Sequence, residues 1–387
     1  MVGGWCDPRF AMVRDEFETN FRERGEIGAA LCLIVRGSTV ADLWGGWTDA
    51  ERQRAWARDT LVNVFSVGKG MIAACTARLI GLGLIDPDAR VSMYWPQFAA
   101  AAKGKVTVRQ LLSHQGGVPA LHEPMAPGSM LDWILMTETL AAEPPWWQPG
   151  SGHGYHVNTF GFLAGELIRL TSGMTPGELL RRELAGPLGA DVHIGLSAAD
   201  QERTAEFHWG DGPPDFAFRE ASVFAKGTAV PDALQMTMNA YFNPPDFSGH
   251  GVVNSAAWRR AEIPSANAHA SAAGVARVYA ALAAGGSIDG VRVVDSVALA
   301  AAAEEQVYGD DLVLQRPSRF GLGFQLTHAE RELGRGPGSF GHFGAGGSVG
   351  FCDPDTGLAL GYVTNQMGPR WRNPRNRALI DASYECL

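Results

Sequence analysis

The chain has 387 residues, of which 46% are hydrophobic and 19% are charged, and this composition excludes a mainly disordered protein. Its net charge of -9 argues against a general binder of nucleic acid or of acidic membranes, because such a protein needs a basic face. The length fits two packed lobes or one large domain. Lysines are rare, so each is more informative than usual: Lys69, Lys103, Lys105 and Lys226.

The five cysteines are scattered and none forms a CxxC pair, so the sequence predicts neither a metal site nor a disulfide framework. The first residues, MVGGWCDPRF, lack the basic region and apolar run of a signal peptide. The longest apolar stretches are too short to span a bilayer. We therefore expect a cytoplasmic protein with no membrane segment, no metal and no other cofactor.

The first third of the chain predicts a helix, a hairpin and a second helix. Residues 8–25 are charged and amphipathic, and residues 28–47 favour two strands around a turn at 36–38. Helical periodicity then runs over 66–84. Its expected buried stripe consists of Ile72, Cys75, Leu79 and Ile80.

The middle of the chain, from about 88 to 275, predicts mostly helices and loops. A short helix is expected within TVRQLLSHQGG, and a clearer one over 158–173, with Asn158 as its N-cap and Gly173 as its stop. Residues 205–268 are rich in Pro, Gly, Asn and Asp, which indicates long loops around a cleft.

Strand-forming sequence returns after a predicted helix at AAGVARVYAALAAGG. Four stretches have β composition and tight glycine turns, and the chain closes with a helix from NPRN onward. The four stretches are 320–326, 339–344, 347–353 and 358–366.

Strands at both ends and helices between them predict an α+β fold with one antiparallel sheet built from both ends of the chain. We expect residues 1–85 and 272–387 to form the lobe that holds this sheet. Residues 86–271 are expected to form an inserted, mainly helical lobe whose long loops line the cleft.

The stretch FSVGKG at 65–70 places Ser66 and Lys69 one helical turn apart, at the start of the second predicted helix. A serine hydroxyl is a poor nucleophile until a base takes its proton, and burial near a helix N-terminus lowers the pKa of a lysine towards that of a useful base. The Ser66 N–H is unpaired in the first turn and is free to hold an oxyanion. The alternative is that Ser66 only caps the helix.

Two further segments carry candidate site residues. Tyr155 lies on a glycine-flanked loop before the 158–173 helix, where a phenol near a cation could relay a proton, although a lone tyrosine is more often a core residue. The segment GHFGAGGSVG (341–350) has the glycine density that lets backbone approach a ligand closely, and its alternative is a plain β-turn.

Taken together, these segments resemble the class C β-lactamase superfamily, closest to the family VIII carboxylesterases. The resemblance spans about residues 20–380 and rests on three ordered motifs, with LLSHQGGVP and PWWQPGSGHGYH as supporting context: SVGK at 66–69, Tyr155, and HFGAGG at 342–347. It implies a β-lactamase/transpeptidase-like fold, with an antiparallel sheet flanked by helices and an all-helical lobe. It further implies Ser66 as nucleophile, Lys69 as base, and Tyr155 as partner in proton transfer.

The resemblance also implies an oxyanion hole formed by the N–H groups of Ser66 and Ala345. We expect His342 and Gly344 to take part in substrate or oxyanion binding beside it. Two departures matter. Val157 stands where lactamases have the Asn of Tyr-x-Asn, and HFG at 342–344 stands where they have Lys-Thr-Gly. Phe343 cannot bind a substrate carboxylate as that triplet does, so we expect poor penicillin turnover and an apolar site suited to an uncharged ester.

Several other residues have rival interpretations. Ser348 matches the G-x-S-x-G of α/β-hydrolases, but no histidine follows it and strand sequence continues, so we interpret it as structural. His153 and His156 lack metal-ligand spacing and are expected to lie in a loop or line the cleft. Pocket and packing alternatives both stay open for a further set: Trp146, Trp147, Asn267, His269 and His342.

The sequence therefore predicts a serine esterase that cleaves short- to medium-chain carboxylic esters of small molecules through an acyl-enzyme on Ser66. Three alternatives remain: a β-lactam or D-amino-acid amide hydrolase, an acyltransferase with the same residues, and a silent binding protein on the same scaffold. The intact set of Ser66, Lys69 and Tyr155 argues against the last. No nucleic-acid or membrane partner is expected, and the sequence leaves the oligomeric state open.

Overall fold

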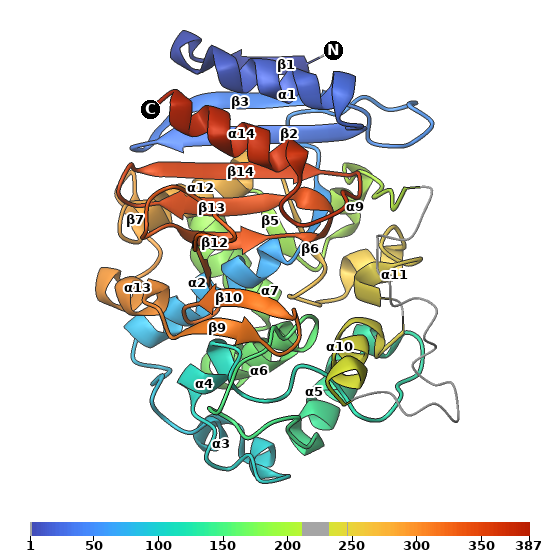
Figure 1. Ribbon diagram of the computed structural model, residues 1–387, viewed down its shortest axis with the longest axis vertical. Helices are drawn as coiled ribbons and strands as arrows, with labels where there is room; N and C mark the ends of the chain where they lie inside the picture. The colour runs from blue at the N-terminus through green and yellow to red at the C-terminus, as the bar shows by residue number, and fades with distance from the viewer. Residues whose placement is uncertain (1, 211–231, 246) are drawn as a thin grey trace.

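The computed structural model describes residues 2–210, 232–245 and 247–387, and its largest element is an antiparallel nine-stranded sheet (Figure 1). The strand order is β1-β3-β2-β14-β13-β12-β11-β10-β9. In chain order these strands are β1 (Val2–Cys6), β2 (Gly28–Val35), β3 (Ser38–Gly46), β9 (Val307–Asp311), β10 (Arg316–Phe320), β11 (Gln325–Leu326), β12 (Phe340–Phe343), β13 (Val349–Asp353) and β14 (Leu358–Thr364).

The two ends of the chain meet inside this sheet, as predicted. Strand β2 pairs with β14, so that Leu31 lies opposite Tyr362, and β2 forms the expected hairpin with β3. Side chains alternate along β2, which sends Leu31 to one face and Cys32 to the other. The sheet is therefore buried on both faces, and this explains why the sequence of β2 is apolar throughout.

Helices cover both faces of the sheet (Figure 1). One face packs against α1 (Ala11–Glu23) and α14 (Pro374–Glu385), with Phe17 and Leu379 among the buried contacts. The other face packs against α12 (Ala272–Ala283) and α2 (Val67–Gly81). This layered arrangement confirms the predicted α+β fold.

Most remaining helices lie below the sheet in the view of Figure 1. The longest is α6 (Thr159–Ser172), which packs on α2 and ends at Gly173 as predicted. The others are α3 (Val91–Tyr94), α4 (Val108–Leu112), α5 (Trp133–Ala142), α7 (Pro176–Leu179), α8 (Gly186–Leu188), α9 (Ala198–Glu202), α10 (Asp232–Phe242), α11 (Ala256–Arg260) and α13 (Ser296–Ala303). The predicted division of the chain at 85/86 and 271/272 stays a prediction.

A small second sheet leads into the site. It contains β4 (Val62–Phe65), β6 (Ala268–Ala270) and β5 (Val192–Ile194), and a separate hairpin is formed by β7 (Ser287–Ile288) and β8 (Val291–Arg292). Strand β4 runs directly into α2, so the helix that carries Ser66 starts from a strand edge fixed by its neighbours.

Three expectations need correction. The segment 205–268 contains α10 and α11 rather than loops alone, and its residues 211–231 and 246 lie outside the described part of the chain. Helix α2 is buried on nearly all sides instead of along one stripe, because it lies between the sheet and α6, and Ile80 is only partly buried. Strands β1 and β9 were not predicted: β1 pairs with β3, which is distant in sequence, whereas β9 forms a hairpin with β10, and the sequences of these two strands, VYGDD and RPSRF, are too polar to indicate strands. Among the described residues no helix has the length and apolar character needed to cross a membrane.

Candidate active site

Ser66 occupies the N-cap position of α2, where β4 ends, and its half-buried hydroxyl points into a cavity. The hydroxyl makes no capping hydrogen bond to the helix. The preceding residue, Phe65, is buried and has a positive φ of 49°, which L residues adopt only under structural constraint. Helix capping, the alternative interpretation of Ser66, therefore does not account for its side chain.

Lys69 lies one turn along α2 and directs its amine at Ser66. Its Nζ is 3.0 Å from Ser66 Oγ and also donates to the carbonyl oxygens of Val157, at 2.6 Å, and Ser265, at 3.2 Å. The side chain is fully buried, and this burial lowers the pKa of Lys69 well below its usual value. Among the described residues no carboxylate pairs with the amine, and burial favours its neutral form. A neutral amine can donate its two hydrogens to the carbonyls of Val157 and Ser265 and keeps a lone pair for the Ser66 hydroxyl.

Tyr155 completes the cluster from the loop before α6. Its ring lies under the Lys69 amine, with Nζ 4.7 Å from the ring centroid. Burial raises the pKa of Tyr155 well above its usual value, and the nearby Ser66 hydroxyl opposes that rise only in part. The expectation that a nearby cation would ease loss of the phenolic proton is thus wrong: Lys69 is driven towards neutrality and the phenol is buried, so Tyr155 keeps its proton.

The Tyr155 backbone is fixed by Asp311 at the end of β9. The two carboxylate oxygens of Asp311 accept the Tyr155 N–H at 3.0 and 3.1 Å, and Asp311 also accepts a hydrogen bond from Ser318 at 2.7 Å. The carboxylate is buried and solvated only by such donors. Strand β9 therefore sets the position of the phenol relative to α2.

The predicted oxyanion segment lies across the cavity from Ser66. Ala345 begins a short 3-10 turn (Ala345–Gly347), and within the described residues neither its N–H nor that of Ser66 donates a hydrogen bond. The Gly346 carbonyl in the same turn accepts hydrogen bonds from Asn373 and Arg375, each at 3.0 Å. These two N–H groups belong to residues that line one cavity, and α14 with its N-cap Asn373 holds the turn that carries one of them.

Arg375 is itself held by a buried ion pair. Its guanidinium is 3.0 Å from the carboxylate of Glu26, and the two side chains are 4% and 0% exposed. Tyr362 and Thr364 also donate to that carboxylate. The buried pair thus joins both ends of the chain to the turn that carries Ala345.

His342 and Gly344 lie behind the cavity wall. A Cβ on Gly344 would come within 2.3 Å of the Val64 carbonyl oxygen, so only glycine lets this segment approach β4 and Ser66 closely. The His342 ring is buried, and its Nδ1 is 2.6 Å from the Phe343 carbonyl oxygen. Burial, with a smaller effect of Lys69, lowers the pKa of His342 to about 3, so the ring is neutral. A direct part in binding stays a prediction for both residues.

A cavity of about 370 Å³ opens at Ser66. Its wall includes Ala345 and Gly346 on one side, and Val157 and Tyr241 among the apolar and aromatic groups. Arg316, Arg370 and Trp371 line its far end. The expectation of an apolar site is therefore incomplete, because one end of the cavity is cationic.

Comparisons with known proteins identify the family to which the chain belongs. A family model described as beta-lactamase matches residues 14–385. The chain belongs to the beta-lactamase family. It is 37% identical over 372 residues to the esterase/beta-lactamase LipL of Mycobacterium tuberculosis, a match that covers 95% of this chain and 83% of LipL.

Two solved structures match this beta-lactamase-family chain, and each match covers 100% of this chain and 100% of the other chain. One is a family VIII carboxylesterase, with 39% identity and a TM-score of 0.90. The other is a penicillin-binding protein homolog from Caulobacter crescentus, with 37% identity and a TM-score of 0.91. The predicted β-lactamase/transpeptidase-like fold and the resemblance to the family VIII carboxylesterases are confirmed.

In this beta-lactamase-family chain, the residues with rival interpretations Ser348, His153 and His156 do not line the cavity at Ser66. Ser348 is buried before a strand, and its hydroxyl accepts the Thr364 N–H at 3.2 Å, which supports a structural role. His156 accepts the Val118 N–H at 3.2 Å, and His153 bonds Ser318 at 2.9 Å, so these rings fix the Tyr155 loop.

The tryptophan and asparagine candidates also pack rather than line the cavity. Trp146 stacks on His122 with ring centroids 3.8 Å apart and donates to the Ala120 carbonyl. Asn267 donates to the carbonyls of Trp258 and Ala261, and thereby shapes the loop that carries Ser265. Trp147 and His269 are likewise absent from the cavity wall.

Sequence reasoning missed two groups that contact the Lys69 amine, the carbonyls of Val157 and Ser265. Any residue supplies a backbone carbonyl, so no side-chain motif could have revealed them. Position 157, where Val replaces the Asn of lactamases, contributes to the site through its backbone carbonyl, which accepts from Lys69. Asp311 was missed because it lies far from Tyr155 in sequence.

Proposed function

We propose that this chain is a serine hydrolase that cleaves short- to medium-chain carboxylic esters through an acyl-enzyme on Ser66. The observation that carries the proposal is the 3.0 Å contact between the buried Lys69 amine and Ser66 Oγ, at a cavity that also receives Ala345. The names of LipL and of the family VIII carboxylesterase support ester cleavage. A cytoplasmic location stays a prediction.

In the proposed first step, neutral Lys69 takes the Ser66 proton as Oγ attacks the ester carbonyl. The carbonyl oxygen becomes an oxyanion that the N–H groups of Ser66 and Ala345 stabilise, a contribution of about 3 kcal/mol per donor. The bond to the alcohol then breaks. Tyr155 keeps its proton at neutral pH and is placed to donate it to the departing alkoxide, and Lys69 restores the phenol.

In the second step, water replaces the alcohol. Lys69 removes a proton from the water as its oxygen attacks the acyl carbon. The bond between the acyl carbon and Ser66 Oγ then breaks, the acid leaves, and Oγ regains a proton from Tyr155, which Lys69 reprotonates. The same pair of proton-transfer groups therefore serves both halves of the reaction. An alcohol in place of water would turn the reaction into acyl transfer.

A second candidate function is cleavage of a β-lactam or a D-amino-acid amide at the same residues. The words esterase/beta-lactamase in the name of LipL favour it. Against it, Phe343 is buried in the core and provides no group to bind a carboxylate. A panel of p-nitrophenyl esters, nitrocefin and a D-alanyl anilide separates these substrates.

The decisive experiment compares two serines with p-nitrophenyl butyrate. Ser66→Ala should lower kcat by about 10⁴-fold or more, because it removes the nucleophile. Ser348→Ala should retain activity, because among the described residues that hydroxyl bonds to the backbone of β14 and to no group of the cavity. Labelling by a fluorophosphonate should likewise require Ser66. A reversed result would transfer the nucleophile to Ser348, and no labelling at all would favour a silent binding protein.

A further inference from the structure

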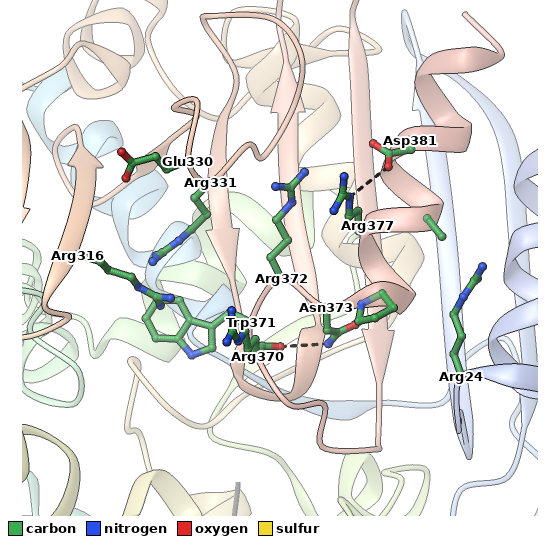
Figure 2. A pocket seen from close by; sticks show the side chains of 12 residues that line it. Arg24, Arg316, Glu330, Arg331, Arg370, Trp371, Arg372, Asn373, Arg377 and Asp381 are labelled. Atoms are coloured by element: carbon green, nitrogen blue, oxygen red, sulfur yellow. Dashed lines mark hydrogen bonds and ion pairs between the residues drawn. The ribbon is translucent and has the colours of Figure 1, made fainter. Parts of the chain in front are cut away.

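A second cavity, of about 510 Å³, adjoins the catalytic cavity and is lined by six arginines and two carboxylates (Figure 2). It lies beside β10 and the N-terminus of α14, and it shares Arg316, Arg370 and Trp371 with the catalytic cavity. The whole chain has a net charge of -9, so this concentration of cations is a local feature and not a general property of the surface.

Three of the six arginines are neutralised by carboxylates. Arg24 pairs with Glu16 at 2.7 Å, Arg372 pairs with Glu332 at 3.2 Å, and Arg377 pairs with Asp381 at 3.6 Å. The other three are Arg316, Arg331 and Arg370. Over residues 2–210, 232–245 and 247–387, no carboxylate lies within ion-pair distance of these three.

Arg331 gives the clearest sign of a missing anion. Its side chain is only 6% exposed, and its Nη1 atom is buried without a hydrogen-bond partner among the described residues. Figure 2 shows this side chain and that of Arg316 extending towards Trp371, whose ring centroid lies 5.2 Å and 5.5 Å from the two guanidinium carbons. Burial, followed by the charge of Arg316, lowers the pKa of Arg331 to about 10.

The unpaired arginines lie next to the residue proposed to protonate the departing alcohol. Trp371 packs against Tyr155 with ring centroids 5.2 Å apart, and the charge of Arg331 acts on the Tyr155 phenol. On this side the two cavities share three lining residues, Arg316, Arg370 and Trp371. A substrate bound at Ser66 can therefore extend its alcohol portion past Tyr155 and Trp371 to the three guanidinium groups.

We propose that the preferred substrates are esters whose alcohol portion carries a phosphate monoester, and that Arg316, Arg331 and Arg370 bind this phosphate. The inference rests on the proposed ester hydrolysis and specifies its substrate class. A single carboxylate is satisfied by one bidentate guanidinium, whereas a phosphate monoester carries up to two charges and three terminal oxygens, which match three convergent cations. Only the acyl–oxygen bond breaks, and the phosphate leaves unchanged on the alcohol.

The experiment measures butyrate release from two matched esters, 1-butyrylglycerol 3-phosphate and 1-butyrylglycerol. For the unaltered enzyme we expect the phosphorylated ester to have a kcat/KM at least about tenfold higher, mainly through a lower KM. Arg331→Gln and, separately, the exposed Arg370→Gln should each reduce that ratio by about tenfold. A general folding defect would lower the rates for both esters and leave their ratio unchanged.

Arg335→Gln is the matched control, because Arg335 is exposed, pairs with Glu385 at 2.6 Å and lies outside both cavities. Its ratio should equal that of the unaltered enzyme. A ratio near one for the unaltered enzyme, or a preference kept by both cavity variants, would overturn the proposal while ester hydrolysis stands. If an ester with a carboxylate in place of the phosphate showed an equal increase in kcat/KM over 1-butyrylglycerol, the assignment to phosphate would be wrong.

A binding measurement tests the phosphate site independently of catalysis. If neither ester is cleaved, the proposed function is refuted, but the binding measurement still shows whether the arginines bind a phosphate. Calorimetry on Ser66→Ala should show that glycerol 3-phosphate binds, and that the added change Arg331→Gln weakens this binding about tenfold. Inorganic phosphate separates the two sources of the anion. If it binds as tightly as glycerol 3-phosphate and no kinetic preference exists, the cavity serves free phosphate and the substrate proposal is wrong.

Discussion

Lys69 and Lys103 lie in two regions of the molecule that surround the lysine amine with similar groups. Both lysines are fully buried, and each directs its amine at backbone carbonyls. For Lys69 these belong to Val157 and Ser265, and for Lys103 they belong to Ala100, Ala141 and Glu143. Each amine also lies over an aromatic ring, Tyr155 at 4.7 Å or Phe98 at 5.0 Å from the ring centroid.

Two differences separate these regions. Lys69 contacts a hydroxyl that faces a cavity, whereas the acceptors of Lys103 among the described residues are carbonyls, which cannot give up a proton. Burial lowers the pKa of both amines, but the Glu143 carboxylate opposes this for Lys103, whose pKa falls only to about 8. Burial of a lysine is thus insufficient for catalysis, which also needs a reacting proton and room for a substrate.

The first test of this difference removes each amine in turn. Lys69→Met should lower kcat for p-nitrophenyl butyrate by about 10³-fold, because Ser66 loses its base. Lys103→Met should leave kcat near that of the unaltered enzyme, because no reacting group contacts Lys103. Steady-state kinetics on both variants, with circular dichroism to confirm folding, provides the measurement. Equal losses of activity in two folded variants would show that burial alone explains the effect.

The second test makes the surroundings of Lys69 resemble those of Lys103. Tyr155→Phe leaves an aromatic ring under the amine but removes the phenolic proton, so kcat should fall by about 10²-fold. Tyr279→Phe is the control, because its hydroxyl is also buried without a hydrogen-bond partner in the described part of the chain, but it lies on the sheet side of α2. Similar kcat values for Tyr155→Phe and the unaltered enzyme would exclude Tyr155 from proton transfer.

The third test uses pH. Lys69 acts as a neutral amine, and burial places its pKa below the usual 10.5. The rate should therefore fall about tenfold per pH unit once pH drops below the lowered pKa, because the protonated amine cannot act as base. No loss of rate is expected near pH 10.0, because burial raises the pKa of Tyr155 well above that value.

Lys103→Met decides which lysine produces this pH dependence. The profile of kcat/KM for the variant should superimpose on that of the unaltered enzyme, although Lys103 titrates near pH 8. If Lys103→Met shifted the pH at which the rate falls on the acidic side, Lys103 and not Lys69 would be the group that causes this fall. A midpoint at or above 10.5 in the unaltered enzyme would show that Lys69 is not held in its neutral form.

The local parts of this site could be predicted from sequence. The β2–β3 hairpin follows from strand composition around a turn, and the start of α2 at Ser66 follows from helical periodicity and the S-x-x-K spacing. Ser66 and Lys69 meet because residues three apart share a helix face. The encounter with Tyr155 needed the family resemblance, because the loop that carries it is distant in sequence.

The parts that sequence could not predict depend on distant packing. Helix α10 forms in a segment whose composition favours loops, because Met236 and Ala240 are buried against the Tyr155 region. The arginine cavity draws Arg316, Arg331 and Arg370 from β10 and two separate loops, so no spacing along the chain reveals it. Backbone carbonyls complete the Lys69 site and leave no trace in a motif.

The smallest expected effect concerns stability in the Lys103 region. Lys103→Met leaves three buried carbonyls without their donor, so the free energy of unfolding should fall by about 1–3 kcal/mol, measured by urea denaturation. The pKa of Lys103 is about 8 in the folded chain against an ordinary 10.5, so between these values the unfolded chain binds more protons. The contribution of Lys103 to stability therefore rises with pH across that window, and the deficit of Lys103→Met should grow from pH 8 to 10.5. A deficit that stays constant over this range would mean that Lys103 is held as a cation, because both states would then keep its proton up to pH 10.5, and this would remove the resemblance to Lys69.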